Sequence, residues 1–224
     1  MSDICGNTTR WLPHNPAAGA FLAVFLLAGA AQAETPEQDA DAPVLVELFL
    51  SQACSMCPPA ATLFHHIAAR KDVVALSWHV DYWNMTTSAH GRWEDPFSAP
   101  AYTLRQKRYN MNIRQRSSIY TPQVIVNGDS QTVGANEEKI SGLIDAAPGA
   151  ATAVSALRKD DAVRFEIGES ENGGNAYLVT FKKSAVTNIT GGQNAGKVFN
   201  EVNVVTDMDR LGMVRKRGGE LLVS

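Results

Sequence analysis

The sequence is short of cysteine, of net charge and of repeated segments. Its 3 cysteines leave no second Cys-x-x-Cys pair, and no His-x-His cluster accompanies them, so the four ligands of a structural zinc site are not available. A formal net charge of −3 gives no basic field, which argues against nucleic acid or an anionic membrane as a partner. No repeat or low-complexity segment interrupts the chain, and a hydrophobic content of 45% predicts an ordinary globular core.

A long hydrophobic run is also lacking, since the one near the N-terminus is too short to span a bilayer comfortably. Arg10 precedes this run, "AAGAFLAVFLLAGAAQA", which ends in Ala31-Gln32-Ala33, a small-x-small cleavage pattern. We therefore expect a secretory signal peptide over residues 1–33, cleaved near Ala33, with an uncleaved anchor as the alternative. The mature protein would be periplasmic or secreted, without a membrane contact after cleavage, and would begin with an acidic leader over residues 34–43.

Alternating strand and helix patterns predict one α/β domain over residues 44–148. The first two strands should be parallel because a helix connects them. Beyond this domain, short β-like pieces separated by Gly and Asn predict a small β-rich annex over 149–224, packed on the domain in a monomer. The predicted order in the domain is a buried strand at 44–50, a helix from Pro58, a strand at 72–80, a helix after Pro100, a strand–turn–strand over 121–134, and a helix capped by Asn136.

The cysteine pair in "SQACSMCPPA" lies where the first strand meets the first helix. Export would remove Cys5 and leave Cys54 and Cys57 in a compartment where disulfides persist. As a structural staple the pair closes a very short loop, which contributes only about 2 kcal/mol. At a helix N-terminus, however, unpaired N–H groups and the helix dipole stabilise a thiolate. Cys54 is therefore expected to have a lowered pKa, to be reachable from bulk water and to act as nucleophile, with Cys57 as the resolving thiol.

The order of these motifs resembles that of the thioredoxin fold: strand, Cys-x-x-Cys at a helix start, strand, and later Thr-Pro before a strand–turn–strand. The resemblance implies a central mixed sheet flanked by helices, a cis bond before Pro122, and contact between Thr121 and the substrate backbone. More specifically, the chain resembles the exported, thioredoxin-like domain-of-unknown-function 1223 family over nearly all of its mature length. The segments that carry this resemblance are "VELFLSQACSMCPPA", "ALSWHVDYW", "DPFSAPAYTLRQ", "YTPQVIVNG" and "GGQNAGKVFNEVNVV".

Two departures from thioredoxins limit what the resemblance implies. Ala53 stands where an aromatic residue precedes the first cysteine, and Ser55-Met56 stands where Gly-Pro separates the pair, so neither potential nor partner carries over. The buried acid that moves the proton of the resolving thiol is matched by Glu47, but with a spacing one residue longer. Glu47 is thus a candidate proton relay, with a structural glutamate as the alternative. Met56 is either an apolar contact for a substrate peptide or a soft ligand for Cu(I).

Two further patterns carry weaker signals. His79 and Asp81 in "WHVDYW" lie at a strand end, where they form a candidate auxiliary pair for proton transfer or, alternatively, a hydrogen-bonded pair that fixes a loop. The segment "GGQNAGKV" matches the G-x-x-x-x-G-K core of a phosphate loop. Val198 replaces the Ser or Thr that should follow the lysine, and the segment lies among β-like pieces, so we interpret it as a glycine-rich turn.

These observations predict an exported thiol–disulfide oxidoreductase that acts on protein thiols or disulfides. The redox-active Cys54–Cys57 disulfide would carry the electrons, so no organic cofactor is expected, and Thr121, Pro122 and Met56 would contact the substrate. Two alternatives remain open: an exported metallochaperone that binds Cu(I) through Cys54 and Cys57, and a binding scaffold whose disulfide is inert.

Overall fold

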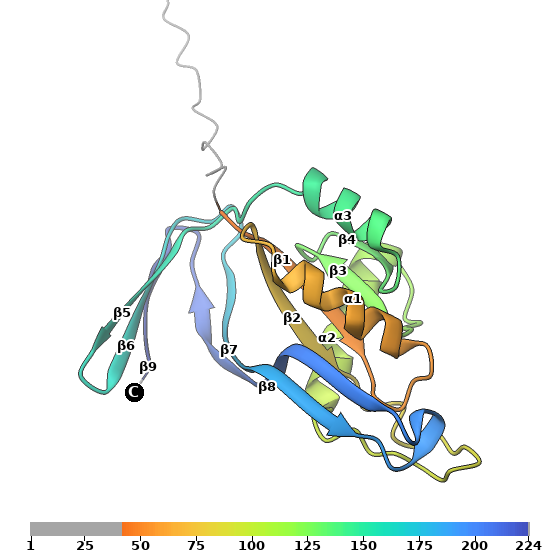
Figure 1. The fold of residues 1–224 in the computed structure, drawn as a ribbon. Helices are drawn as coiled ribbons and strands as arrows, with labels where there is room; N and C mark the ends of the chain where they lie inside the picture. The colour runs from red at the N-terminus through yellow and green to blue at the C-terminus, as the bar shows by residue number, and fades with distance from the viewer. Residues whose placement is uncertain (1–41, 224) are drawn as a thin grey trace, which may run out of the picture. The chain divides into compact units, whose positions relative to one another are not determined.

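The chain forms a mixed α/β structure in which helices flank a central mixed sheet (Figure 1). The computed structural model describes residues 42–223; the expected signal peptide and nearly all of the acidic leader lie outside the described residues. Among residues 42–223, no helix is both long and apolar enough to cross a membrane. The elements are β1 (Val44–Leu50), α1 (Cys57–Ala68), β2 (Val73–His79), α2 (Pro100–Arg114), β3 (Gln123–Val126), β4 (Ser130–Val133), α3 (Glu137–Ala146), β5 (Val154–Lys159), β6 (Ala162–Ile167), β7 (Gly174–Asn188), the 3-10 turn η1 (Gly192–Asn194), β8 (Val198–Val214) and β9 (Gly219–Val223).

The central sheet has six strands in the order β4-β3-β1-β2-β8-β7. β1 and β2 are parallel along their whole length, as the strand–helix–strand pattern predicts. β3 runs antiparallel to β1 and forms a hairpin with β4. Asn127 and Gly128 link β3 to β4 with φ values of 49° and 75°, the left-handed pair that a tight hairpin turn requires.

The two faces of β1 pack against different helices. Val46, Leu48 and Leu50 are buried in one cluster with residues of α1 and α3. Phe49 points to the opposite face and packs in a second cluster with Tyr102 of α2. Because successive side chains of a strand alternate between faces, this strand is buried on both sides, which explains its nearly continuous apolar sequence.

The helix boundaries follow local sequence signals. α1 begins at Cys57 and has prolines in its first turn, where a missing N–H group leaves no hydrogen bond unmade. The Asn136 side chain accepts a hydrogen bond from the Lys139 N–H at 3.0 Å, so the predicted cap of α3 is confirmed.

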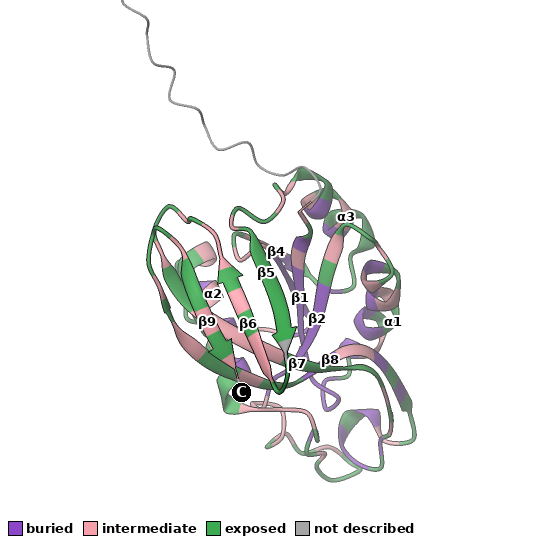
Figure 2. Cartoon of the chain, turned by 90° about the vertical axis from the view of Figure 1, so that its left-hand side faces the viewer, coloured by how far each residue is buried: buried purple, intermediate pink, exposed green. Residues whose placement is uncertain are grey.

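The structure draws the boundary at residue 148 differently from the sequence prediction. β8 pairs with β2 through Ser77 and Val204, and β7 pairs with β8 from Asn188 to Gly174, so these two strands complete the central sheet. Only β5, β6 and β9 form a separate three-stranded sheet. In Figure 2 this smaller sheet is mostly exposed or half-buried, whereas the buried residues gather around β1, β2 and the helices. The sequence pattern of residues 149–224 predicts strands, but it does not indicate which strand pairs with which.

Candidate dithiol site

The cysteine pair lies at the junction of β1 and α1, as predicted. Cys54 belongs to the turn that follows β1, and Cys57 is the first residue of α1. The Cys54 N–H donates to the Ser51 carbonyl at 3.1 Å, and the Cys57 N–H donates to the Cys54 carbonyl at 3.1 Å. Both side chains are thiols in the structure.

The Thr121–Pro122 segment lies beside this turn, because it precedes β3, the strand that pairs with β1. The Thr121–Pro122 peptide bond is cis, the geometry that the sequence resemblance implies. The Cys54 sulfur lies 3.9 Å from the Thr121 carbonyl oxygen, and the Trp83 indole N–H donates to the Thr121 hydroxyl at 2.7 Å. The structure therefore brings Cys54, Cys57, Thr121 and Pro122 into one site.

The two thiols ionise very differently. A hydrogen bond from the Cys57 thiol lowers the pKa of Cys54 to about 6; burial opposes this shift, while Thr121 and the backbone at Met56 and Cys57 add to it. Burial raises the pKa of Cys57 well above its ordinary value, and the neighbouring Cys54 adds to that shift. Such a separation gives one sulfur the character of a nucleophile at neutral pH and keeps the other protonated.

The expectation that bulk water reaches Cys54 is wrong for this structure. Cys54 is only 1% exposed and Cys57 is fully buried, because both lie in the apolar cluster between the sheet and α1. Trp83 packs against the same cluster. Met56, between the cysteines, is 65% exposed. Met56 therefore lies at the surface of the turn, while neighbouring side chains cover both sulfurs.

Glu47 is not brought to the cysteines. It points to the face of β1 that α2 covers, where Arg105 Nε lies 2.7 Å from its Oε1 and the Tyr109 hydroxyl donates to its Oε2 at 2.6 Å. The cysteines pack on the other face. The structure thus supports the alternative assignment of Glu47 as a structural glutamate, held in an ion pair with Arg105.

His79 and Asp81 do not form a pair either. His79 Nδ1 lies 2.7 Å from Asp95 Oδ2, and its Nε2 lies 3.4 Å from Glu201 Oε1, an ion pair longer than a well-formed hydrogen bond. The Asp81 side chain instead accepts from the Thr103 hydroxyl at 2.5 Å. We call Asp95, His79 and Glu201 the ionic cluster; its carboxylates come from the segment before α2 and from β8, so no local sequence pattern links them to the imidazole.

The ionic cluster shifts the titration of each of its members. Burial alone would lower the pKa of His79, but the charges of Asp95 and Glu201 outweigh it and raise that pKa to about 9. Burial tends to raise the pKa of Asp95, yet the His79 charge keeps it below its ordinary value. Burial raises the pKa of Glu201 in spite of His79. The cluster therefore holds a buried imidazolium between two acids at neutral pH.

The ionic cluster should make the free energy of unfolding depend on pH. This dependence should differ between the dithiol and disulfide forms, because Cys54 titrates only in the dithiol form. His79, with a pKa raised from 6.5 to about 9, contributes stability that is fully present below about pH 6.5 and is lost as pH rises through about 9. Cys54 acts in the opposite sense: its pKa falls from 9.0 to about 6, so its contribution is present above about pH 9 and lost as pH falls through about 6.

We therefore expect different pH profiles for the two redox forms in urea titrations. In the disulfide form, where Cys54 has no proton to lose, the free energy of unfolding should fall between pH 6.5 and about 9, by an amount on the order of 3 kcal/mol. In the dithiol form, the gain from Cys54 should offset most of this fall. A disulfide form whose stability does not change over this range would contradict a charged His79.

The glycine-rich segment before β8 forms a turn and not a phosphate loop. Residues of η1 pack against the cysteine turn, and the Asn194 side chain donates to the carbonyls of Gln52 and Cys54, each at 2.8 Å. Gly192 has φ of 70°, and a Cβ atom there would lie 2.8 Å from the Trp93 Cβ. The glycine thus permits a close approach that any side chain would prevent.

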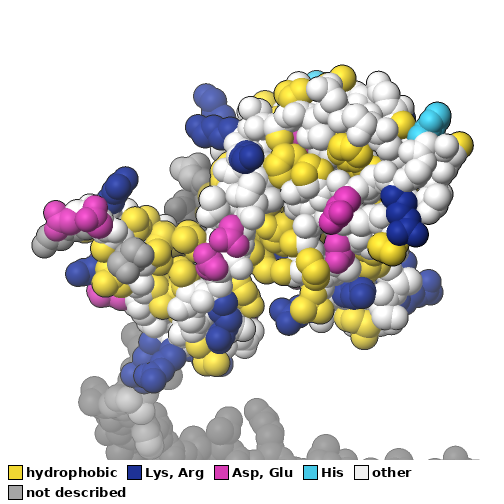
Figure 3. Space-filling view, turned by 90° about the horizontal axis from the view of Figure 1, so that it is seen from below, with side chains coloured by type: hydrophobic (Ala, Val, Ile, Leu, Met, Phe, Trp, Pro, Cys, Tyr) yellow, Lys and Arg dark blue, Asp and Glu magenta, His cyan; other side chains and the backbone are white. Residues whose placement is uncertain are grey.

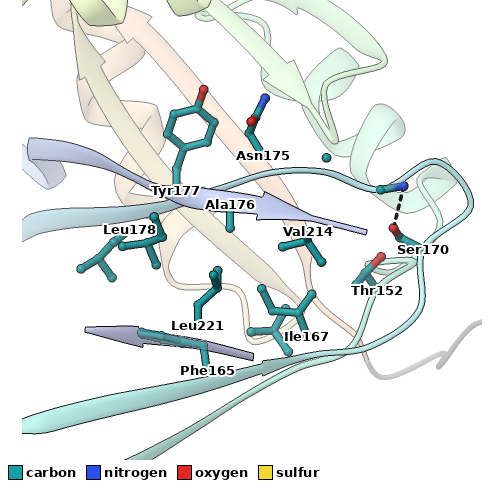
Figure 4. A pocket seen from close by; sticks show the side chains of 14 residues that line it. Thr152, Phe165, Ile167, Ser170, Asn175, Ala176, Tyr177, Leu178, Val214 and Leu221 are labelled. Carbon is teal, nitrogen blue, oxygen red and sulfur yellow. Dashed lines mark hydrogen bonds between the residues drawn. The ribbon is translucent and has the colours of Figure 1, made fainter. Parts of the chain in front are cut away.

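A separate hollow lies between the two sheets. Its volume is about 370 Å³, and Figure 4 shows Phe165, Ile167 and Leu221 of the smaller sheet facing Leu178 and Val214 of the β7–β8 pair. In Figure 3 the lobe that carries the smaller sheet also shows apolar side chains between charged ones. None of the residues that line this hollow belongs to the dithiol site.

These features define a mixed α/β protein with a buried, asymmetric dithiol at a strand–helix junction. Residues 45–223 match the model of the family described as protein of unknown function (DUF1223), and the chain belongs to that family. An X-ray crystal structure of a protein from Agrobacterium tumefaciens is similar to it, with 29% identity, 80% of this chain and 77% of that chain covered, and a TM-score of 0.68. No curated protein matches the chain.

Proposed function

We propose that this protein is an exported thiol–disulfide oxidoreductase of thioredoxin-like fold. The observation that carries the proposal is the geometry of the dithiol: Cys57 begins α1, and the sulfur of Cys54, in the preceding turn, lies 3.9 Å from the Thr121 carbonyl oxygen. In this setting the pKa of Cys54 is lowered and that of Cys57 is raised. The Thr121 backbone beside Cys54 and the strand order around β1 support the fold assignment. The apolar run and cleavage pattern before residue 34 support export.

The proposed reaction has two exchange steps. The Cys54 thiolate attacks one sulfur of a substrate disulfide, the substrate S–S bond breaks, a mixed disulfide forms, and the released substrate thiolate takes up a proton. Cys57 then loses its proton and attacks the Cys54 sulfur, which releases the second substrate thiol and leaves a Cys54–Cys57 disulfide. The substrate gains two electrons and the enzyme loses two. A dithiol reductant restores the enzyme, and the same steps in reverse oxidise a substrate dithiol.

The surroundings of the pair suggest how a protein substrate is held. The Thr121 backbone lies next to Cys54, so an extended substrate segment can pair with it once the side chains over the sulfur move. Exposed Met56 offers an apolar, adaptable contact beside the sulfur. The high pKa of Cys57 keeps this thiol protonated, so it attacks only after the mixed disulfide has formed next to it.

The proposal is tested by measuring thiolate absorbance against pH together with the rate of exchange with a model protein disulfide. We expect Cys54 to titrate near pH 6 and exchange to be faster than with glutathione at the same thiol concentration. A pKa near the ordinary thiol value of about 8.5, with exchange no faster than glutathione, would refute the proposal. Stoichiometric copper after purification under reducing conditions, without catalysed exchange, would instead favour the metallochaperone.

A further inference from the structure

The turn that carries Cys54 is held from behind by Gln52, whose polar groups are all used. Its backbone N–H donates to Asp95 Oδ2 at 2.7 Å, and its carbonyl accepts from Asn194. Its side-chain amide donates to Glu201 Oε2 at 2.7 Å and to Thr187 Oγ1 at 3.1 Å, and its amide oxygen accepts from the Trp93 indole at 3.2 Å. Gln52 is fully buried, so each lost bond would leave a buried polar group without a partner.

Gln52 connects both acids of the ionic cluster to the cysteine turn. Asp95 Oδ2 accepts at 2.7 Å from His79 and also at 2.7 Å from the Gln52 backbone. Glu201 Oε1 lies 3.4 Å from His79 Nε2 in an ion pair without a hydrogen bond, and Glu201 Oε2 accepts a hydrogen bond from the Gln52 side chain. All three side chains are buried, so moving either acid away from the imidazole would leave uncompensated charge in the interior.

We infer that the ionic cluster of Asp95, His79 and Glu201 positions Cys54 through Gln52, and that this holds the Cys54 sulfur where α1 and Cys57 stabilise its thiolate. The effect on the Cys54 thiolate does not require the proposed function; only its importance for catalysis rests on that function. These are positioning residues, since none of them touches the sulfur. The hydrogen bonds that lower the pKa of Cys54 come from Cys57, Thr121 and the backbone at Met56 and Cys57. These hydrogen bonds depend on the position of the turn that carries Cys54. Gln52, two residues before Cys54 in the sequence, anchors that turn.

Gln52→Leu tests this inference, because leucine fills a similar volume but makes none of the three side-chain hydrogen bonds. We expect the pKa of Cys54, read from thiolate absorbance, to rise from about 6 toward about 8.5; the full rise would lower the thiolate population at pH 7 about thirtyfold. Glu47→Gln is the matched control. Like Gln52→Leu, it changes a fully buried polar side chain, but on the face of the sheet away from the cysteines, so it should lower stability and leave the Cys54 titration unchanged.

A Gln52→Leu protein that folds and retains a Cys54 pKa near 6 would overturn the inference. So would a Glu47→Gln protein that shows the same shift, because the effect would then reflect general loosening. If Gln52→Leu does not fold, the wild-type protein supplies the test. Oxidation of the cysteine pair should move the NMR resonances of the His79 ring and the Gln52 side-chain amide but not those of Arg105. Resonances of His79 and Gln52 that stay in place on oxidation would refute it.

Both readouts are independent of turnover. If the wild-type protein catalyses no disulfide exchange but shows these shifts, the proposed function is refuted and the positioning role of Gln52 is supported. If the wild-type protein catalyses exchange but Gln52→Leu leaves the pKa of Cys54 unchanged, the positioning role is refuted and the proposed function is supported.

Discussion

Cys54→Ser should reduce disulfide exchange to the uncatalysed background, a loss on the order of a thousandfold or more, whereas Cys57→Ser should stop the reaction at its midpoint. Serine at position 54 removes the attacking sulfur, so no covalent intermediate forms. Serine at position 57 leaves the attack intact but removes the resolving thiol, so the mixed disulfide with the substrate should accumulate. Non-reducing electrophoresis and mass spectrometry after acid quenching would detect that adduct.

The two cysteine variants control each other, because both replace sulfur by oxygen in the same buried cluster. Cys57→Ala, which unlike serine leaves no donor at this position, should also raise the pKa of Cys54, since the hydrogen bond from the Cys57 thiol is the largest cause that lowers it. In the alanine variant the adduct should therefore form more slowly than the first step in the wild-type protein. An adduct that forms equally well in Cys54→Ser would show that Cys57 attacks first and would reverse the assigned roles.

Arg105→Met should cost about 3–5 kcal/mol of folding free energy, the largest stability effect that we expect from a residue outside the dithiol site. Arg105 lies 2.7 Å from the fully buried Glu47 and stands over the rings of Trp78 and Tyr109 at 4.9 and 5.0 Å. Methionine retains part of the packing but leaves the Glu47 carboxylate in the interior without its counter-charge. Urea denaturation at pH 7 measures the loss.

The double variant Arg105→Met with Glu47→Leu is the control for this interpretation. Replacing both members of a buried ion pair with apolar residues is often neutral, so the double variant should recover most of the stability lost in the single one. A single variant that loses less than about 1 kcal/mol would show that water or a rearranged hydrogen bond compensates Glu47.

Local signals in the sequence predicted the parts of the fold that depend on neighbouring residues. Prolines after Cys57 indicate the start of α1, Asn127-Gly128 indicates the hairpin turn, and Asn136 indicates the cap of α3. Each of these is decided within a few residues, by φ preference or by one side-chain hydrogen bond. The same signals placed the cysteines at a helix N-terminus and Thr121–Pro122 before a strand.

The rest of the candidate site depends on segments that are far apart in the sequence. Glu201 reaches His79 only because β8 pairs with β2, and no pattern in either segment specifies that pairing. Glu47 could have faced either side, because β1 is buried on both faces and alternation alone does not tell which helix covers which face. The burial of Cys54 likewise follows from tertiary packing that the helix-start signal does not include.

Because β8 pairs with β2, we expect that a fragment of this protein must include β8 to fold without aggregating. A fragment ending at residue 148 would leave the outer side of β2 without its neighbour, with backbone N–H and C=O groups along an uncovered apolar edge. Such an edge is a template for intermolecular strand pairing, so recombinant fragments cut there should aggregate, and expression designs need to extend through Val214.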